Sequence, residues 1–210
     1  MIKKYCYIFG AAKMHGHLIE PQTEDLIIAA DGGYKMCKKL NLEPDVLIGD
    51  FDSLKTNYTA KETISLPQEK DDTDMLAAIK LGFSKGYSYF LIYGGTGGRI
   101  DHTLANIQAL VFISTNGGRG WLYEKHCVIT AITNSAVTFN ANYRGYVSIF
   151  AANGTAHGVN ESGLKYELSN AEINESFPIG VSNEFLGNES KISVLNGTLI
   201  IVYPDLGEQI

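Results

Sequence analysis

The sequence has few cysteines, no basic surplus and no long apolar run, and each absence excludes a class of protein. Cys6, Cys37 and Cys127 are odd in number and far apart, which fits neither a zinc knuckle nor a redox dithiol and favours reduced thiols in a cytoplasmic protein. The 17 Lys and Arg residues are outnumbered by 23 Asp and Glu residues, giving a net charge of −6, which argues against a nucleic-acid partner. No apolar run approaches the length of a membrane span, so we expect no membrane partner.

The N-terminus resembles a signal peptide in one respect, because Lys3 and Lys4 precede an apolar stretch. That stretch, residues 5–12, is short, includes Gly10 and runs into Lys13. A first buried strand fits it better than a signal peptide.

The first half of the 210-residue chain alternates short apolar runs with helical patterns. The runs are rich in β-branched and aromatic residues and cover residues 5–11, 26–30, 46–48 and 89–93. Apolar stripes at helical spacing cover residues 73–85 and 102–114. This alternation predicts a mostly parallel sheet covered by helices on both faces.

From about residue 120 the pattern changes to short alternating stretches separated by turn residues, and no helix is predicted. Asn153-Gly154 is one turn signal, and Asn196-Gly197 is another that predicts a two-residue hairpin. We therefore expect an α/β fold class with two domains. A mostly parallel α/β sheet domain covers residues 1–118, and a small all-β sandwich or barrel covers residues 119–210.

Four polar segments follow predicted strands of the first half, at the sheet edge where open parallel sheets bind ligands. Asp31-Gly32-Gly33 lets backbone N–H groups approach a phosphate or ribose, although a strand-ending Asp-Gly alone is more often a plain turn. Asp50 and Asp52 could both face one Mg²⁺, an ion that binds carboxylates, waters and substrate phosphates. Equally, Asp50 could cap the next segment while Asp52 stays solvated.

The third segment, Asp71-Asp72-Thr73-Asp74, opens a predicted helix. Capping and the helix dipole account for one or two of its acidic residues. Three carboxylates within four residues repel one another, and a bound cation would relieve that repulsion.

The fourth segment, residues 94–102, has four glycines in its first five positions, between a predicted strand and a predicted helix. Such a segment suits a backbone cradle around phosphates, with Arg99 supplying positive charge. It is neither a P-loop, because the Gly-Lys-Ser/Thr ending is absent, nor a dinucleotide Gly-x-Gly-x-x-Gly motif. His102 alone is more typical of a hydrogen-bonding residue at a helix start than of a base or a metal ligand.

Together the carboxylates, the arginine and the glycines fit a metal–triphosphate complex, in which catalysis rests on charge neutralisation and alignment. Two other classes stay open. Asp50-Phe51-Asp52 also suits a sugar-nucleotide transferase, and Asp101-His102 suits a metal-dependent phosphoesterase, although no second adjacent His supports a dinuclear site. A non-catalytic nucleotide-binding module is a further reading, against which the many adjacent carboxylates argue.

In order and spacing these segments resemble the motif series of thiamin pyrophosphokinases. The segments that carry the resemblance are Asp31-Gly32-Gly33, GDFDS at 49–53, DDTD at 71–74, GGTGGRIDHTLAN at 94–106, SGLKY at 162–166 and VSNE at 181–184. The resemblance covers nearly the whole chain.

The resemblance implies Mg²⁺-dependent transfer of pyrophosphate from ATP to thiamin, giving thiamin diphosphate and AMP. It also implies an α/β domain, a β-sandwich domain and a homodimer with thiamin between its subunits. The residue roles that it implies are metal binding by Asp50, Asp52 and Asp74; catalysis by these three and Asp101; ATP binding by Asp31, Gly32, Gly33, Asp72, Thr73, Gly95, Arg99, His102 and Asn106; and thiamin binding by Tyr166, Ser182 and Asn183. Tyr166 stands where the family often has Trp, and it either faces the thiazolium cation or packs in the sandwich.

Overall fold

The structure is a computed structural model that describes residues 3–14, 20–51, 58–67, 69 and 71–207. Its elements are β1 (Tyr5–Phe9), β2 (Leu26–Ala30), the 3-10 helix η1 (Asp31–Gly33), α1 (Tyr34–Lys39), β3 (Val46–Gly49), β4 (Glu62–Ser65), α2 (Asp74–Ser84), β5 (Tyr89–Tyr93), α3 (Ile100–Thr115), β6 (Arg119–Tyr123), β7 (Cys127–Thr133), β8 (Ala136–Phe139), β9 (Gly145–Ser162), β10 (Leu168–Ile173), β11 (Asn183–Phe185), β12 (Ser190–Ser193) and β13 (Asn196–Pro204). In this part of the chain no helix combines the length and the apolar character needed to cross a bilayer.

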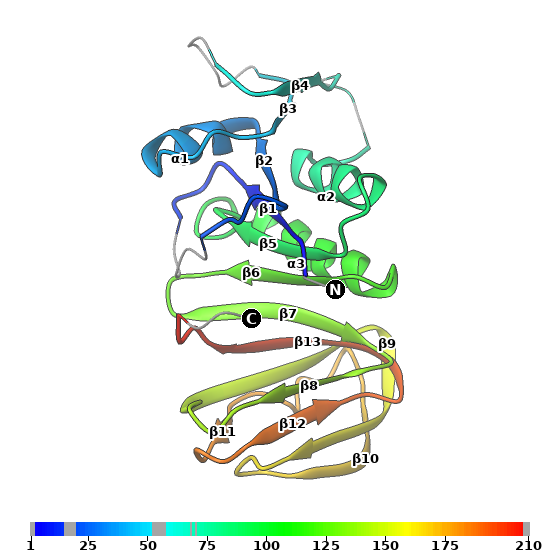
Figure 1. The fold of residues 1–210 in the computed structure, drawn as a ribbon. Coiled ribbons are helices and arrows are strands. Elements are labelled where there is room, and N and C mark those ends of the chain that lie inside the picture. The colour runs from blue at the N-terminus through cyan, green and yellow to red at the C-terminus, as the bar shows by residue number, and fades with distance from the viewer. Residues whose placement is uncertain (1–2, 15–19, 52–57, 68, 70, 208–210) are drawn as a thin grey trace.

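A mixed sheet runs from the first half of the chain into the second, and the fold is α/β (Figure 1). Strands β4, β3, β2, β1, β5 and β6 lie in that order and pair in parallel. Strand β6 then pairs antiparallel with β7, β7 with β13, and β13 with β9. Backbone hydrogen bonding therefore continues across the predicted boundary at residue 118, because β6 belongs to the parallel strands.

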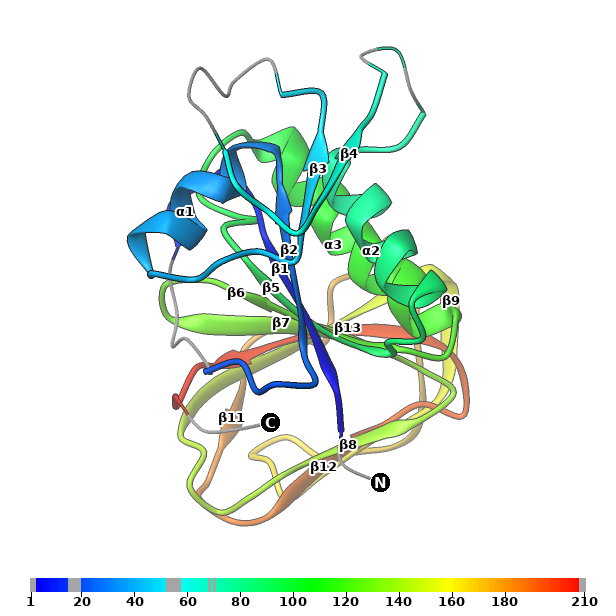
Figure 2. The ribbon, with the colours of Figure 1, turned by 45° about the horizontal axis from the view of Figure 1, so that its top comes forward.

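Neighbouring residues of the parallel strands face opposite sides of the sheet, and two hydrophobic cores result. Ile8 packs in one core with residues of α2 and α3 such as Ile79 and Leu110. Tyr7 packs in the other with Cys37 of α1 and with side chains of the β-rich half. Figure 2 shows α1 on one side of β1–β3 and α2 and α3 on the other. The apolar runs of the first half are thus covered on both faces.

The β-rich half is organised around β9, whose 18 residues pair with β13, β12, β10 and β11. The predicted turn at Asn153-Gly154 is wrong, because both residues lie inside β9. Both residues have positive φ angles, 59° and 105°, and they lie where the register between β9 and β13 shifts. The left-handed backbone that Asn and Gly favour therefore forms a bulge in a continuous strand instead of a turn. The predicted hairpin at Asn196-Gly197 is also wrong: these residues begin β13, and β12 and β13 each pair with β9 rather than with each other.

Candidate active site

A cavity of about 440 Å³ lies at the carboxyl ends of β1, β2, β3 and β5. Its lining residues are Gly10, Ala11, Ala12, Ala30, Asp31, Asp50, Thr73, Asp74, Met75, Gly94, Gly95, Gly98, Arg99, His102, Thr103 and Asn106. The carboxyl ends of parallel strands meet at one edge of a sheet, and this is why segments far apart in the sequence come together here. The stretch from Gly10 to Ala12 was not among the predicted site residues, because the first strand was predicted over residues 5–11, whereas β1 ends at Phe9 and leaves Gly10 at the strand end.

A larger cavity, of about 730 Å³, lies at the opposite ends of β5 and β6, where Tyr89 and Arg119 line it. Among its described lining residues Glu189 is the only carboxylate. We therefore place the candidate active site in the smaller cavity, where three carboxylates and the glycine-rich segment meet.

The segment Asp31-Gly32-Gly33 contributes one side chain to the cavity. Asp31 lines it, whereas Gly32 and Gly33 are buried and lie outside its lining. A Cβ on Gly33 would lie 1.8 Å from the carbonyl oxygen of Phe9, so glycine is needed there for η1 to pack against β1. This glycine serves the packing of the strand-end loop.

Asp50 follows β3 and also lines the cavity. A Cβ on the preceding Gly49 would lie 3.2 Å from the Cα of Asp31, so the loops after β2 and β3 run close together. Asp52 lies outside the described residues.

The segment before α2 divides between the cavity and the protein surface. Thr73 caps the helix, because its Oγ1 accepts a hydrogen bond from the backbone N–H of Leu76 at 3.2 Å. Asp74, the first residue of α2, lines the cavity together with Thr73. Asp72 is not part of the lining, and both of its carboxylate oxygens accept hydrogen bonds from Lys80 Nζ at 2.7 Å.

The glycine-rich segment after β5 is locked to the loop after β1. Gly94 has a φ of 66°, and a Cβ there would lie 2.7 Å from the carbonyl oxygen of Gly10. The backbone N–H of Ala12 donates to the Gly94 carbonyl oxygen at 3.0 Å. On the other side, the buried side chain of Asn106 donates through Nδ2 to the Gly95 carbonyl oxygen at 2.7 Å. The conformation of this segment is therefore held from β1 and from α3.

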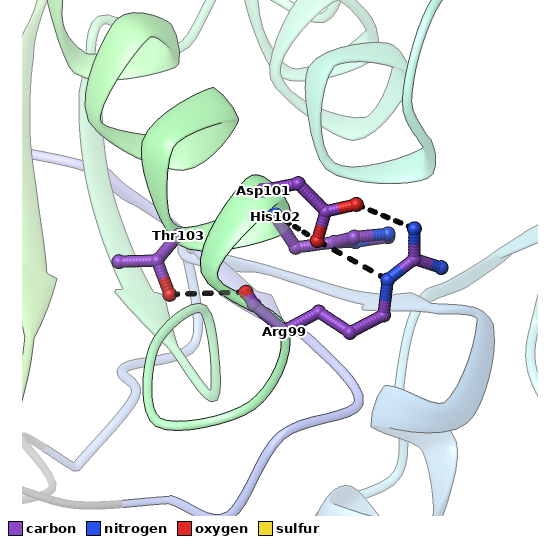
Figure 3. A network of polar contacts seen from close by, with 4 residues as sticks. All are labelled: Arg99, Asp101, His102 and Thr103. Atoms are coloured by element: carbon purple, nitrogen blue, oxygen red, sulfur yellow. Dashed lines mark hydrogen bonds and ion pairs between the residues drawn. The ribbon is translucent and has the colours of Figure 1, made fainter.

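Arg99 and Asp101 form an ion pair at the start of α3 (Figure 3). Arg99 donates through Nε to Asp101 Oδ1 at 3.1 Å and through Nη2 to Oδ2, and the backbone N–H of His102 donates to Oδ1 at 2.9 Å. The guanidinium lowers the pKa of Asp101 below its usual range, and both side chains are exposed. Arg99 and His102 line the cavity, whereas Asp101 does not. An ionised carboxylate in the first turn also interacts favourably with the helix dipole.

The cavity carries oxygen donors suited to a hard cation. Asp31, Asp50 and Asp74 come from three different segments of the chain. Across the residues that the structure describes, no three His, Cys, Asp or Glu side chains are grouped closely enough to hold a metal ion by themselves. Mg²⁺ does not need such a cage, because it usually keeps several waters and binds one or two carboxylates together with substrate phosphates. The donor set therefore fits Mg²⁺ bound together with a phosphate-bearing ligand.

The three predicted thiamin-binding residues lie in the β-rich half, and none lines this cavity. The Tyr166 side chain is exposed. Ser182 has a φ of 63° and donates through its backbone N–H to Ser148 Oγ at 3.0 Å. Asn183 is buried and hydrogen-bonded within the chain.

Comparison with protein families covers both halves of the chain. Residues 20–119 match the catalytic domain of thiamin pyrophosphokinase, and residues 126–199 match the thiamin pyrophosphokinase vitamin B1 binding domain. The chain belongs to the thiamin pyrophosphokinase family. Members of this family are transferases. The catalytic-domain match includes the segments after β2, β3 and β5, and the vitamin B1 match includes Tyr166, Ser182 and Asn183.

Individual relatives of this family agree with the match. A thiamine pyrophosphokinase of Bacillus subtilis (strain 168) is 28% identical over 185 residues, which cover 84% of this chain and 86% of that protein. Thiamin pyrophosphokinase 1 of Caenorhabditis elegans is 24% identical over 155 residues, which cover 67% of this chain and 62% of that protein. The crystal structure of a Bacillus subtilis thiamine pyrophosphokinase shares the fold, with a TM-score of 0.81, 23% identity, and coverage of 96% of this chain and 99% of that one.

Proposed function

We propose that this chain transfers a pyrophosphoryl group from ATP to thiamin with the help of Mg²⁺, giving thiamin diphosphate and AMP. The observation that carries the proposal is the cavity in which Asp31, Asp50 and Asp74 meet the glycine-rich segment and Arg99, in a chain that matches both domains of the family. A hard cation, a triphosphate and a fixed positive charge are the partners that this set of groups suits.

Residues 1–118 would bind the nucleotide and the metal, and residues 119–210 would bind thiamin. Mg²⁺ would be held by Asp50, Asp52 and Asp74, and its role is to neutralise charge on the transferring phosphates. The lining position of Asp31, Thr73, Gly95, Arg99, His102 and Asn106 supports their assignment to ATP. We assign Gly32, Gly33 and Asp72 supporting roles at the same site. The two glycines are buried in the loop that carries Asp31, and Asp72 forms a salt bridge with Lys80 of α2.

In the proposed reaction the thiamin hydroxyl oxygen forms a bond to the β-phosphorus of ATP. The bond between that phosphorus and the oxygen bridging it to the α-phosphorus breaks, and AMP leaves with the bridging oxygen. The sequence has no P-loop lysine for γ-transfer, and Arg99, which lines the cavity, would secure phosphate charge. A carboxylate accepts the hydroxyl proton, and of Asp74 and Asp101 we assign this role to Asp74, because Asp74 lines the cavity and Asp101 does not.

We further propose a homodimer in which one subunit's cavity faces the partner's thiamin-binding residues. The β-rich half exposes six large apolar side chains on connected segments around β11, each between 45% and 68% exposed: Tyr146, Tyr166, Phe177, Ile179, Val181 and Leu186. Ile100 and Leu104 are likewise exposed at the start of α3, beside the cavity. Exposed large apolar side chains gathered on neighbouring segments are typical of a protein interface. A second copy would cover these surfaces and bring Tyr166 and Ser182 toward the reacting hydroxyl.

We also propose a cytoplasmic location. The cysteines Cys6, Cys37 and Cys127 are all unpaired in the structure, and burial raises the pKa of the Cys37 thiol to about 12. Unpaired cysteines are typical of a reducing compartment.

The test is incubation of the purified protein with ATP, Mg²⁺ and thiamin, with the products separated by chromatography. We expect thiamin diphosphate, and no product when EDTA is added. Thiamin monophosphate serves as the matched control acceptor, because its hydroxyl is already blocked, and it should give no diphosphate. Absence of product with thiamin, or consumption of nucleotide sugars instead, would contradict the proposal.

A further inference from the structure

A buried polar network holds the backbone of Tyr166, whose side chain is exposed. Asn183, at the start of β11, is 5% exposed, and Glu161, near the end of β9, is 3% exposed. The side-chain amide of Asn183 bonds both backbone groups of Tyr166: Oδ1 accepts from the Tyr166 N–H at 3.0 Å, and Nδ2 donates to its carbonyl oxygen at 2.7 Å. One side chain thus holds the peptide groups on both sides of the tyrosine Cα.

The remaining hydrogen-bonding capacity of Asn183 is also used within the chain. Oδ1 accepts a second hydrogen bond, from the Glu184 N–H at 2.9 Å, and Nδ2 donates its second hydrogen to Glu161 Oε2 at 3.1 Å. An amide has two donor hydrogens and two acceptor lone pairs, and all four are occupied here. Asn183 therefore has nothing to offer a ligand unless one of these bonds breaks.

Glu161 fixes the orientation of that amide. Its carboxyl lies on the interior side of β9, where the opposing residue on β12 is the buried Ile192. Oε2 is the acceptor for Asn183 Nδ2, and Oε1 is buried without a hydrogen-bond partner among the described residues. Burying a carboxyl with one unpaired oxygen costs free energy. Because Glu161 Oε2 accepts from Asn183 Nδ2, an amide flipped by 180° would lose this bond and turn Oδ1 toward Oε2, placing two hydrogen-bond acceptors together.

We infer that Glu161 and Asn183 are positioning residues: they hold the backbone of Tyr166, one of the residues assigned to thiamin, and Asn183 does not itself contact the acceptor. This inference rests on the proposed function. Tyr166 is 61% exposed, and Lys165 Nζ lies 5.7 Å from the centroid of its ring. Lys165 is in turn held by Glu184 through an ion pair of 2.7 Å. An aromatic face on a fixed backbone suits a cationic heteroaromatic acceptor.

The test compares two substitutions of Glu161. Glu161→Gln keeps an acceptor oxygen for Asn183, whereas Glu161→Met has a similar length but no acceptor. We expect the Met variant to raise KM for thiamin about tenfold, the effect of losing one hydrogen bond, while KM for ATP stays unchanged. The Gln variant should stay close to the wild type. The Met variant removes a buried carboxyl but leaves Asn183 Nδ2 without its acceptor, so its melting temperature is measured beside KM, and a structural role alone would change KM for ATP and for thiamin alike.

Three further measurements make the result decisive. Ile192→Val is the matched control, since it loosens the core opposite Glu161 without touching the network, and it should lower stability but leave KM unchanged. In a Tyr166→Ala background Glu161→Met should add no further loss. Asn183→Asp, which loses both donors, gives a second route to the same KM increase, and Glu161→Gln should restore part of the loss by donating to the new carboxylate.

Amide hydrogen exchange, measured by NMR without substrates, tests the network independently of activity. The Tyr166 amide should exchange faster in Glu161→Met, whereas the neighbouring Lys165 amide, bonded to the Glu184 carbonyl oxygen, should not change. A wild-type protein that is inactive on thiamin would refute the proposed function. The exchange of the Tyr166 amide would still test whether Glu161 and Asn183 hold the Tyr166 backbone. An active enzyme whose KM and Tyr166 protection are the same in Glu161→Met as in wild type would overturn the inference. So would equal losses in the Gln and Met variants, or a full additional loss in the Tyr166→Ala background.

Discussion

The stability of the protein is expected to fall as the pH rises through the range in which Glu161 ionises. Burial raises the pKa of Glu161 from its ordinary value of 4.5 to about 7, against the smaller opposing effect of the hydrogen bond from Asn183. Between these two values the folded protein keeps the proton on Glu161, whereas the unfolded chain has released it. Because the folded state then binds more protons, the free energy of unfolding decreases with rising pH in this window. Below 4.5 both states are protonated, and above about 7 both are ionised, so the contribution is constant outside the window.

The size of the effect follows from the two pKa values. Each pKa unit corresponds to about 1.4 kcal/mol, so the free energy of unfolding should fall by about 3 kcal/mol between pH 4.5 and pH 7.5. For a chain of this length about 1 kcal/mol corresponds to roughly 2–4 °C in melting temperature. The expected loss is therefore on the order of 10 °C.

The assay is urea unfolding of the wild type and of Glu161→Gln at several pH values from 4.5 to 7.5, with tryptophan fluorescence as the signal. Trp121 is the only tryptophan and is buried in β6, so it reports unfolding directly. The glutamine variant cannot ionise, and its stability advantage over the wild type should grow by about 3 kcal/mol across this range. Other groups, including Asp101, titrate in both proteins and cancel in the difference. Parallel pH profiles for the two proteins would refute the assignment of a raised pKa to Glu161.

The other predictions concern the cavity and the loops that build it. Asp74→Asn is expected to lower kcat about a hundredfold or more, because it removes a carboxylate from the cavity. Asp72→Asn removes only a salt bridge outside the cavity, and its kcat should stay within about threefold of the wild type. Steady-state kinetics would measure both, and equal losses of kcat would contradict the assignment of Asp74 to the site. Gly33→Ala should cost more than about 2 kcal/mol in urea unfolding, because the new methyl meets the backbone of β1. Gly98→Ala, whose new Cβ would lie 3.7 Å from its nearest neighbour, should change the free energy of unfolding by less than about 0.5 kcal/mol, and a similar cost for both would contradict the packing argument. Asn106→Ala removes the donor to the glycine-rich segment, and it should raise KM for ATP about tenfold while leaving KM for thiamin nearly unchanged; an increase in the thiamin KM alone would be the contrary result.

Local patterns in the sequence were sufficient to predict the strand ends that build the cavity. The apolar runs at 26–30 and 89–93 match β2 and β5, and the residues after them line the cavity as the topology of a parallel sheet requires. The segment at 71–74 was predicted to open a helix, and it does: the side chain of Thr73 caps α2. These features depend on residues close to one another in the chain.

Features that depend on distant partners could not be predicted in this way. Asn153-Gly154 has the composition of a turn, but pairing with β13 carries β9 through it as a bulge. Asn183 belongs to a segment associated with thiamin, yet its amide is occupied by Tyr166 and Glu161, which are 17 and 22 residues away. The sequence shows no pattern for such a contact, since a buried glutamate looks like any other charged residue in an alternating strand.

Product stoichiometry tests the central claim most directly. Phosphorus NMR of a reaction containing ATP, Mg²⁺, thiamin and the purified protein reports every phosphorylated species at once. The account predicts AMP and thiamin diphosphate in equal amounts, with no thiamin monophosphate at any time and no ADP. Formation of ADP, or passage through the monophosphate, would show attack at the γ-phosphorus and contradict the proposed reaction even if thiamin is the acceptor.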